Sequence, residues 1–347
     1  MSGRPLPRAG TSLPILALIL LGLALPMAVL LAGCGSGAKT TTSGPTLPPV
    51  TSTTDANPTA AATLTTTTPA QTAAFPVTVT DDDKKTVTIS KEPTRIVSTA
   101  PSNTEILFAL GLGPRVVGVS STDDYPPAVK ALAKVGSFLE VNNELVMARS
   151  PDLVLGTHGD EEALAPIAKT GIPALYLEPS SVEGIYASID TIGQATGATA
   201  QATALVASLK AQMKAVADVA AKTGTSPTVF YALDNTLWTV GPGSLEDELI
   251  RLAHGTNVAD ENAGPASKAY FQLAAEQLVA LNPDVILLAN TAYKSAQEFT
   301  SDPRFASLKA VKDGQVLVIN DVIITRPGPR IAEGLKVLAT ALHPGAF

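Results

Sequence analysis

The sequence has little of what catalysis usually requires. It contains one cysteine, Cys34, and three histidines, His158, His254 and His343, in 347 residues. A single cysteine excludes a disulfide within the chain. The sequence also lacks a Gly-x-Ser-x-Gly elbow and a phosphate-binding loop, which mark many hydrolases and nucleotide-binding enzymes. These absences predict a protein that is not an enzyme and that holds no cofactor and no metal of its own.

Positive charge is scarce as well. The chain carries 24 Lys and Arg against 31 Asp and Glu, a net charge of −7. Because nucleic-acid phosphates are held by basic surfaces, this balance excludes a nucleic-acid partner. Aromatic residues make up only 4% of the chain, whereas 45% of its residues are hydrophobic. Length and hydrophobic content therefore predict a globular body large enough for two domains.

The N-terminus has the pattern of a secretory signal. Arg4 and Arg8 precede an apolar run over residues 13–31, and small residues lead to Cys34. A cysteine at this point resembles a bacterial lipobox, which predicts a signal peptide over residues 1–33 and a lipid anchor on the cysteine. The alternative is a membrane-spanning helix, since the run is nearly long enough to cross a bilayer. Two prolines in the run favour the anchor, so we expect an extracytoplasmic protein attached to the cell membrane.

The segment after the cysteine, residues 34–74, consists mainly of Thr, Ser, Pro, Ala and Gly. It has too few apolar residues to offset the entropy lost on ordering, so it is predicted to be disordered. A flexible chain of about 40 residues spans roughly 35 Å. The segment is therefore interpreted as a tether between the membrane anchor and the folded body.

Strand and helix patterns alternate over residues 75–198. Alternating apolar runs at 77–79 and 87–89 predict a β-hairpin. Further strand-like runs, with helical segments between them, lie at 95–98, 116–119, 153–155 and 174–177. At the start of the first helix, Ser102 and Glu105 have the spacing of a capping box. The alternation predicts an N-terminal α/β lobe with a mainly parallel sheet.

A long helix is predicted over residues 199–224. Its narrow apolar stripe suits a helix that bridges two domains instead of being buried in one. The alternation then resumes over residues 225–347, with strands at 228–233, 285–289 and 316–319 and helices at 244–254, 272–281 and from 329. The predicted fold is two similar α/β lobes with mainly parallel sheets, bridged by one long helix.

The two halves repeat one pattern. In each half a glutamate, Glu144 or Glu276, is followed seven residues later by a Pro-Asp pair and then by an apolar strand. A Pro-Asp turn between helix and strand is a common connector, but it does not require a glutamate at the same offset. The repeat therefore indicates that the lobes are structural duplicates.

These features together resemble the bacterial solute-binding proteins of ABC importers for cobalamin and ferric siderophores. The resemblance runs from about residue 95 to the C-terminus. It depends on the order and spacing of the two glutamate segments and of residues 95–98, 101–105, 117–121, 124–127, 237–244 and 326–331. Proteins of this family hold a ligand in a cleft between two lobes that are joined by one rigid helix, and they catalyse no turnover. The resemblance implies a lipoprotein that delivers a corrinoid or, alternatively, a ferric siderophore or haem to an ABC permease.

The resemblance also gives the repeated glutamates a role. Glu144 and Glu276 match glutamates on the outer rim of each lobe that pair with arginines of a dimeric permease. Two like charges on duplicated lobes suit a two-subunit partner. The alternative is that both are ordinary solvated helix residues.

Ligand contacts are expected after the carboxyl ends of the strands, where open α/β sheets bind their ligands. The predicted contacts are Ser102, Asn103, Phe138, His158, Asp234, Trp238, Tyr293 and Arg326. Trp238, the only tryptophan, lies in a predicted loop after the first strand of the second lobe. Arg326 suits an anionic or amide-rich ligand, although it also has the position of a helix cap. His158 suits the metal centre of a ligand, the alternative being a solvated side chain.

Few aromatic residues are available for a flat macrocycle. Cobalamin binders of the family place several aromatics against the corrin ring, whereas Thr122 and Thr157 hold corresponding positions here and Phe138 and Trp238 remain. This leaves open another corrinoid or a ferric siderophore. A zinc or manganese carrier is a rival interpretation, but such sites need several His and carboxylate ligands, and His158 alone is too few.

Overall fold

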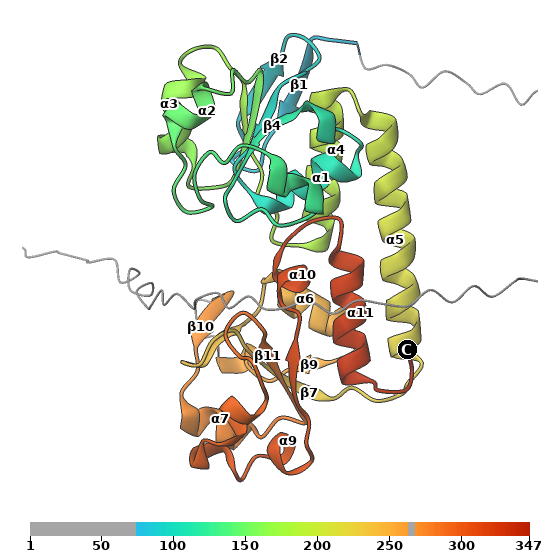
Figure 1. Cartoon of the computed structure of the whole chain (residues 1–347). Coiled ribbons are helices and arrows are strands. Elements are labelled where there is room, and N and C mark those ends of the chain that lie inside the picture. The colour runs from blue at the N-terminus through green and yellow to red at the C-terminus, as the bar shows by residue number, and fades with distance from the viewer. Residues whose placement is uncertain (1–73, 263–267) are drawn as a thin grey trace, which may run out of the picture. The chain divides into compact units, whose positions relative to one another are not determined.

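The structure, a computed structural model, describes residues 74–262 and 268–347. These residues form two α/β lobes, with the long helix α5 (Thr199–Ala221) running beside them (Figure 1). The predicted two-lobe architecture is confirmed. The predicted lipidation site, Cys34, and the signal peptide and tether around it lie outside the described residues, apart from residue 74.

Within residues 74–262, a four-stranded parallel sheet forms the centre of the N-terminal lobe. Its order is β4 (Val116–Val119), β3 (Ile96–Ser98), β5 (Leu153–Gly156), β6 (Ala174–Tyr176). The strands are buried almost throughout, as expected for a parallel sheet covered on both faces. In the register, Ser98 lies opposite both Val119 and Leu155, so the carboxyl ends of these strands meet at one edge.

A hairpin and several helices surround this sheet. The strands β1 (Val77–Thr80) and β2 (Thr86–Ile89) pair in antiparallel fashion, which confirms the predicted hairpin. The connecting elements are α1 (Pro101–Ala109), η1 (Gly113–Arg115), η2 (Pro127–Ala131), α2 (Asn143–Met147), α3 (Glu161–Ala168) and α4 (Val182–Thr196). The hairpin is tied to the lobe by Asp81, whose carboxylate accepts a hydrogen bond from the Tyr176 amide.

The C-terminal lobe has a mixed sheet of six strands over the described parts of residues 225–347. Its order is β10 (Tyr270–Gln272), β8 (Trp238–Val240), β7 (Thr228–Ala232), β11 (Val285–Ala289), β12 (Val316–Ile319), and β9 (Thr256–Asn257) also pairs with β7. Strands β7, β9, β11 and β12 are parallel, whereas β8 pairs in antiparallel fashion with both β7 and β10. The connecting elements are α6 (Leu245–Leu252), η3 (Asp260–Asn262), α7 (Ala275–Leu281), α8 (Gln297–Thr300), η4 (Pro303–Phe305), α9 (Lys309–Lys312), α10 (Val322–Thr325) and α11 (Ile331–Leu342).

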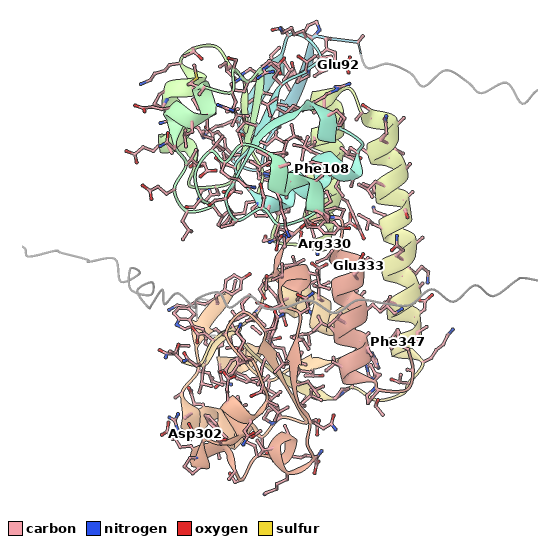
Figure 2. All side chains as sticks on the ribbon, in the orientation of Figure 1. Glu92, Phe108, Asp302, Arg330, Glu333 and Phe347 are labelled. Atoms are coloured by element: carbon pink, nitrogen blue, oxygen red, sulfur yellow. The ribbon has the colours of Figure 1, made fainter. Side chains whose placement is uncertain are left out.

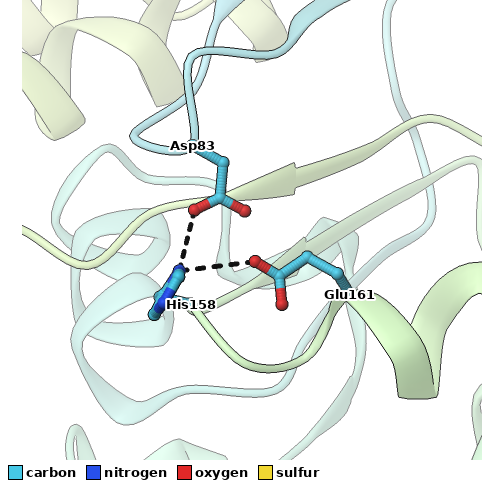
Figure 3. Close-up of side chains that lie close together, drawn as sticks. All are labelled: Asp83, His158 and Glu161. Carbon is cyan, nitrogen blue, oxygen red and sulfur yellow. Dashed lines mark hydrogen bonds and ion pairs between the residues drawn. The ribbon is translucent and has the colours of Figure 1, made fainter.

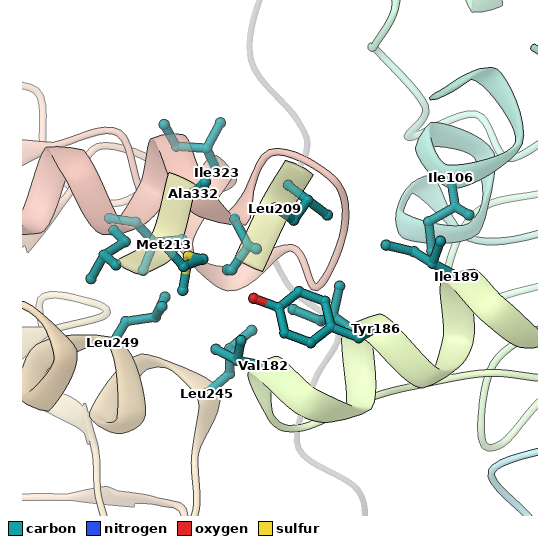
Figure 4. Packing of buried hydrophobic residues seen from close by; sticks show 14 of the residues in the cluster. Ile106, Val182, Tyr186, Ile189, Leu209, Met213, Leu245, Leu249, Ile323 and Ala332 are labelled. Atoms are coloured by element: carbon teal, nitrogen blue, oxygen red, sulfur yellow. The ribbon is translucent and has the colours of Figure 1, made fainter. Parts of the chain in front are cut away.

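Helix α5 packs against α4 of the first lobe and against α11 of the second. Gly197 ends α4 in the left-handed conformation, with φ of 77°, which lets the chain turn directly into α5. Leu209 and Met213 of α5 are buried in a cluster that also contains Tyr186 of α4 and Leu249 of α6 (Figure 4). One hydrophobic cluster therefore contains residues of both lobes and of the long helix, and each lobe has a second cluster of its own. The predicted boundaries at 75–198, 199–224 and 225–347 stay predictions.

Three local expectations were wrong. Ser102 does not cap α1: the helix begins at Pro101, and no side chain caps it. Glu105, the other half of the expected capping box, is buried and pairs with arginines far along the chain. Trp238 begins a strand instead of lying in a loop, and residues 270–272 form the edge strand β10, so the helix expected from 272 begins only at α7.

Among the helices of the described residues, none combines the length and the apolar character needed to cross a bilayer.

Candidate functional site

A cleft of about 430 Å³ lies between the two lobes. This volume is within the range of small-molecule sites. The N-terminal lobe contributes Pro101, Ser102, Thr122, Phe138, Thr157 and Glu178. The C-terminal lobe contributes Thr291, Asp321, Val322, Thr325, Arg326 and Pro327.

Most of these residues follow the carboxyl end of a parallel strand by one to three positions. Thr157 follows β5, Glu178 follows β6, Thr291 follows β11 and Asp321 follows β12. Because parallel strands end at the same edge of their sheet, the loops after them gather at one place. The expectation that ligand-contacting loops follow the strands thus agrees with the position of the cleft.

The cleft walls are mainly hydroxyl-bearing and small apolar side chains. Phe138 is the aromatic residue among the lining side chains that the structure describes, and it is 37% exposed. The carboxylate of Asp321 is engaged by Thr291, which donates its hydroxyl at 2.6 Å and its amide at 3.2 Å. Burial raises the pKa of Glu178, against the opposing effect of His158. The Asp321 carboxylate is thus already hydrogen-bonded within the wall, and burial disfavours the charged form of Glu178.

The cation of the cleft, Arg326, belongs to an ion-pair cluster between the lobes. Its Nη1 donates to Glu105 Oε1 at 2.8 Å and to Asp124 Oδ1 at 2.7 Å. Arg330 donates to both Glu105 oxygens, at 2.6 and 2.8 Å, and its guanidinium stacks 4.2 Å from the ring centroid of Tyr125. Figure 2 places Arg330 where the two lobes meet. The arginines are thus neutralised by acids of the opposite lobe before any ligand binds.

Behind the cleft, buried polar side chains hold the loops in place. Asn103 is fully buried and donates to the carbonyl oxygens of Gly156 and Leu177 at 3.0 and 3.4 Å. Burial raises the pKa of Asp123 to about 6, although its carboxylate accepts a hydrogen bond from the Thr104 hydroxyl at 3.0 Å. These contacts connect helix α1 to the ends of the strands and so fix the floor of the N-terminal half.

The structure brings three of the predicted contacts into the cleft lining: Ser102, Phe138 and Arg326. Asn103 lies below the surface instead. His158 lies outside the lining residues, with its side chain 77% exposed, next to Asp83 and Glu161.

Asp234, Trp238 and Tyr293 form a group of their own at the carboxyl end of β7. Asp234 Oδ1 accepts hydrogen bonds from the amide and hydroxyl of Thr236 and from the Trp238 amide. Tyr293 donates its hydroxyl to the Asp234 carbonyl oxygen at 2.8 Å, and its ring is buried. The indole of Trp238 is 43% exposed. In this group, Trp238 is the side chain with exposed apolar surface, and it does not line the cleft.

Glu178 and Arg330 are two residues of this region that were not among the predicted contacts. Glu178 follows the strand-like run at 174–177, so the same strand-end rule would have found it. Arg330 has no local signal, because its partner Glu105 lies 225 positions earlier.

The repeated glutamates occupy equivalent places in the two lobes. Glu144 is the second residue of α2 and Glu276 the second residue of α7, and both are exposed. The hydrophobic residue two positions later, Val146 or Leu278, is fully buried in each case. Each glutamate is therefore held on a short helix that is fixed to its lobe by one buried side chain.

Comparison with known proteins gives consistent matches over the folded body. The model of the periplasmic binding protein family matches residues 96–322. An uncharacterized ABC transporter substrate-binding lipoprotein of Bacillus subtilis is 36% identical over 78% of this chain and 87% of its own length. A cobalamin-binding protein of Halobacterium salinarum is 30% identical over 77% of this chain and 74% of its own. The periplasmic heme-binding protein RhuT from Roseiflexus superposes with a TM-score of 0.66 and 29% identity, over 73% of this chain and 99% of its own.

Proposed function

The chain belongs to the periplasmic binding protein family, and we propose that it captures a corrinoid of the cobalamin type and delivers it to an ABC import permease. The observation that carries this proposal is the inter-lobe cleft with hydroxyl-rich walls and engaged charges. Corrinoids carry many neutral amide groups, which hydroxyl and backbone groups bind without a free ionic partner. In this role the protein binds and releases its ligand unchanged, as a carrier and not as an enzyme.

Haem fits these walls less well than a corrinoid. Haem iron is normally held by a histidine, tyrosine, methionine or cysteine, and none of the described residues lining the cleft is of these types. Haem propionates also need a cation, and Arg326 is already bound to two acids. The cobalamin-binding relative supports the corrinoid. The heme-binding structure supports haem as an alternative, and a ferric siderophore is a further alternative from the sequence resemblance.

Fluorescence of the only tryptophan tests the ligand class. We expect Trp238 emission to quench on titration with cobalamin or cobinamide, because its indole is half-exposed at the carboxyl end of β7. Haem and ferric siderophores are titrated in parallel, and equilibrium dialysis measures each affinity independently of absorbance by the ligand. Trp238→Phe serves as the control for signals that do not come from this site. Tighter binding of haem or a siderophore than of either corrinoid would contradict the proposal.

We further propose that Glu144 and Glu276 dock the loaded protein onto the two permease subunits. Their exposure and their equivalent positions on α2 and α7 support this role. The double variant Glu144→Arg with Glu276→Arg is expected to abolish import while ligand affinity stays unchanged. Glu183→Arg with Glu333→Arg is the matched control, since these two residues are exposed, lie one in each lobe, and belong to α4 and α11. Normal import by the first pair would refute the docking role.

The membrane anchor is the third part of the proposal. We propose that Cys34 is the lipidated N-terminus of the mature protein at the outer face of the cell membrane, with residues 34–74 as its tether. The lipoprotein name of the Bacillus relative supports this location. Cys34→Ala is expected to prevent incorporation of labelled fatty acid and to leave the precursor unprocessed. Continued labelling of that variant would exclude the assignment.

A further inference from the structure

Three side chains from separate parts of the N-terminal lobe converge at its edge (Figure 3). Asp83 lies in the turn between β1 and β2, His158 follows β5, and Glu161 is the first residue of α3. His158 Nδ1 lies 3.0 Å from Asp83 Oδ1 and 3.4 Å from Glu161 Oε1. The fold thus brings an imidazole and a carboxylate to one point although they are 75 positions apart in the chain.

The neighbouring acids are engaged elsewhere, which makes this convergence specific. Asp81 accepts from the Lys85 amide at 2.8 Å, and Asp82 accepts from the Glu178 amide at 2.8 Å. Asp160 accepts from the Thr99 hydroxyl at 2.7 Å. Asp83 Oδ1 and Glu161 Oε1 face His158, whereas their second oxygens accept from Lys85 Nζ and from the Gly159 amide; the two side chains are only 12% and 28% exposed. Two partly buried carboxylates this close to each other favour a cation between them.

We propose that Asp83, His158 and Glu161 form a binding site for a divalent transition-metal ion, for which Zn²⁺ is the test ion. Imidazole nitrogen and carboxylate oxygen are both common zinc ligands. At bond lengths of about 2.0–2.1 Å, the ligand atoms of a tetrahedral zinc lie about 3.3 Å apart. The two separations from His158 Nδ1 bracket that value. Three protein ligands leave one position for water.

The charges at the site are compatible with such an ion. A hydrogen bond from the Glu161 carboxyl, together with those from His158 and Lys85, lowers the pKa of Asp83. The hydrogen bond to Asp83 raises the pKa of His158, and the ion would take the place of the proton that this pairing favours. Lys85 Nζ contacts Asp83 Oδ2 at 3.4 Å, which leaves Oδ1 for the metal.

The site is separate from the cleft, because none of its three residues lines the cleft. An ion held there would connect the β1–β2 hairpin to the loop after β5 and to α3. A ligand that binds only the folded state stabilises it, so metal is expected to raise the melting temperature. The proposal does not depend on which solute the cleft carries.

Calorimetric titration with Zn²⁺ tests the proposal directly. The full chain is purified in detergent without a polyhistidine tag and carries Cys34→Ser in every arm, so that the only thiol cannot bind the ion. One saturable site per chain is expected. Asp83→Asn, His158→Gln and Glu161→Gln should each weaken binding by more than about 10-fold, since even indirect disturbance of a metal ligand costs roughly 10–100-fold.

Two control variants match the test variants in chemistry. Glu162→Gln removes the exposed carboxylate next to Glu161, and His254→Asn removes another imidazole where φ is 57°, a conformation that asparagine tolerates. Both should bind Zn²⁺ like the parent protein, and circular dichroism confirms folding of every variant. The proposal is overturned if the parent binds no saturable ion, or if the three site variants keep the parent's affinity and its zinc-dependent rise in melting temperature.

Discussion

The two lobes share a frame, by which we mean the sheet, the Pro-Asp pair and the glutamate-bearing short helix of each lobe. They differ in the residues that line the cleft. At the amino end of the sheet in each lobe, an aspartate after a proline holds the start of the first strand. Asp152 accepts from the Thr94 amide and hydroxyl and from the Arg95 amide. Asp284 accepts from the Thr228 amide at 2.9 Å and from its hydroxyl at 2.7 Å. The aspartate of each Pro-Asp pair therefore holds the start of a strand in place by hydrogen bonds, which a generic turn would not do.

The residues before the two prolines repeat as well. Ser150 has φ of 46° and Asn282 has φ of 45°, both in the left-handed region that side-chain-bearing residues rarely adopt. The same unusual turn in both lobes, at the same distance from Glu144 and Glu276, is a strong sign of duplication. What is duplicated is the frame together with the two exposed glutamates.

The ligand-facing parts are not duplicated. The N-terminal sheet is wholly parallel, whereas the C-terminal sheet adds β8, which pairs in antiparallel fashion with β7 and β10 and begins with Trp238. The N-terminal lobe contributes Phe138 to the cleft and acids to the inter-lobe cluster; the C-terminal lobe contributes the arginines. Under the proposed function, the duplicated frame would face the two permease subunits, while the unlike walls would face the ligand.

The largest loss of stability is expected in the ion-pair cluster between acids of the N-terminal lobe and arginines of the C-terminal lobe. Glu105 has a 1% exposed side chain and pairs with Arg326 and Arg330, which are 16% and 17% exposed. Glu105→Ala leaves two nearly buried guanidinium groups with one partner fewer, and removal of one member of a buried pair costs about 3–5 kcal/mol. We expect a loss of about 3 kcal/mol in the free energy of unfolding, measured by urea denaturation.

An exposed ion pair on α5 provides the control for that loss. Asp218 pairs with Lys214 one helical turn away, and both side chains are at least half exposed. Asp218→Ala should cost less than about 0.5 kcal/mol. If the two variants were equally destabilised, the inter-lobe cluster would not hold the lobes together more than an ordinary surface pair does.

A smaller loss of stability is expected when either aspartate of the repeated Pro-Asp pairs is replaced. Asp152→Ala and Asp284→Ala each remove a carboxylate that accepts several hydrogen bonds, and hydrogen bonds to charged groups contribute about 1.5–3 kcal/mol. We expect each variant to lose about 2 kcal/mol in urea denaturation. If one variant lost much unfolding free energy and the other lost none, the two aspartates would not have equivalent roles in their lobes.

The acid dependence of stability sharpens this test for Asp284. Hydrogen bonds from Thr228 lower its pKa below the ordinary value of 3.8. Its folded-state pKa is depressed, so the stabilisation is fully present above that ordinary value and is lost as the pH falls through the folded-state pKa. Denaturation at a series of acidic pH values should show a flatter curve for Asp284→Asn than for the parent protein. Parallel curves would mean that the carboxylate charge adds nothing.

Much of the frame was predictable because its signals are local. Buried parallel strands appear as continuous apolar runs, and the run at 285–289 coincides with β11. The paired glutamates could be found from the sequence, because a repeat is detected by comparing two short segments directly. Edge strand β10 was not predicted, and its last residue, Gln272, was assigned to the helix that follows, since three residues are too few to distinguish the two periods.

The cleft and the ion pairs were predictable only in part, because they depend on contacts across the chain. The strand-end rule located the loops, but it could not tell that Asn103 would face inward or that Arg326 would already be paired. Glu105 lies 221 positions from Arg326, and its local spacing from Ser102 suggested a helix cap instead. Ion pairs between residues of different lobes produce no local pattern in the sequence of either lobe.

The smallest effect is expected on ligand affinity, at the aromatic side chain that the N-terminal lobe contributes to the cleft and that has no counterpart among the lining residues of the C-terminal lobe. Phe138 supplies the aromatic surface of the cleft among its described lining residues and lies in the loop that follows Gly136. Phe138→Ala should weaken corrinoid binding about 10-fold, equivalent to about 1.4 kcal/mol, through lost stacking area. Leu139→Ala is the matched control, because Leu139 is the next residue, is 82% exposed and does not line the cleft. Equilibrium dialysis measures both, and equal affinities would show that the ligand is held without this ring, and thus by the polar walls that both lobes contribute.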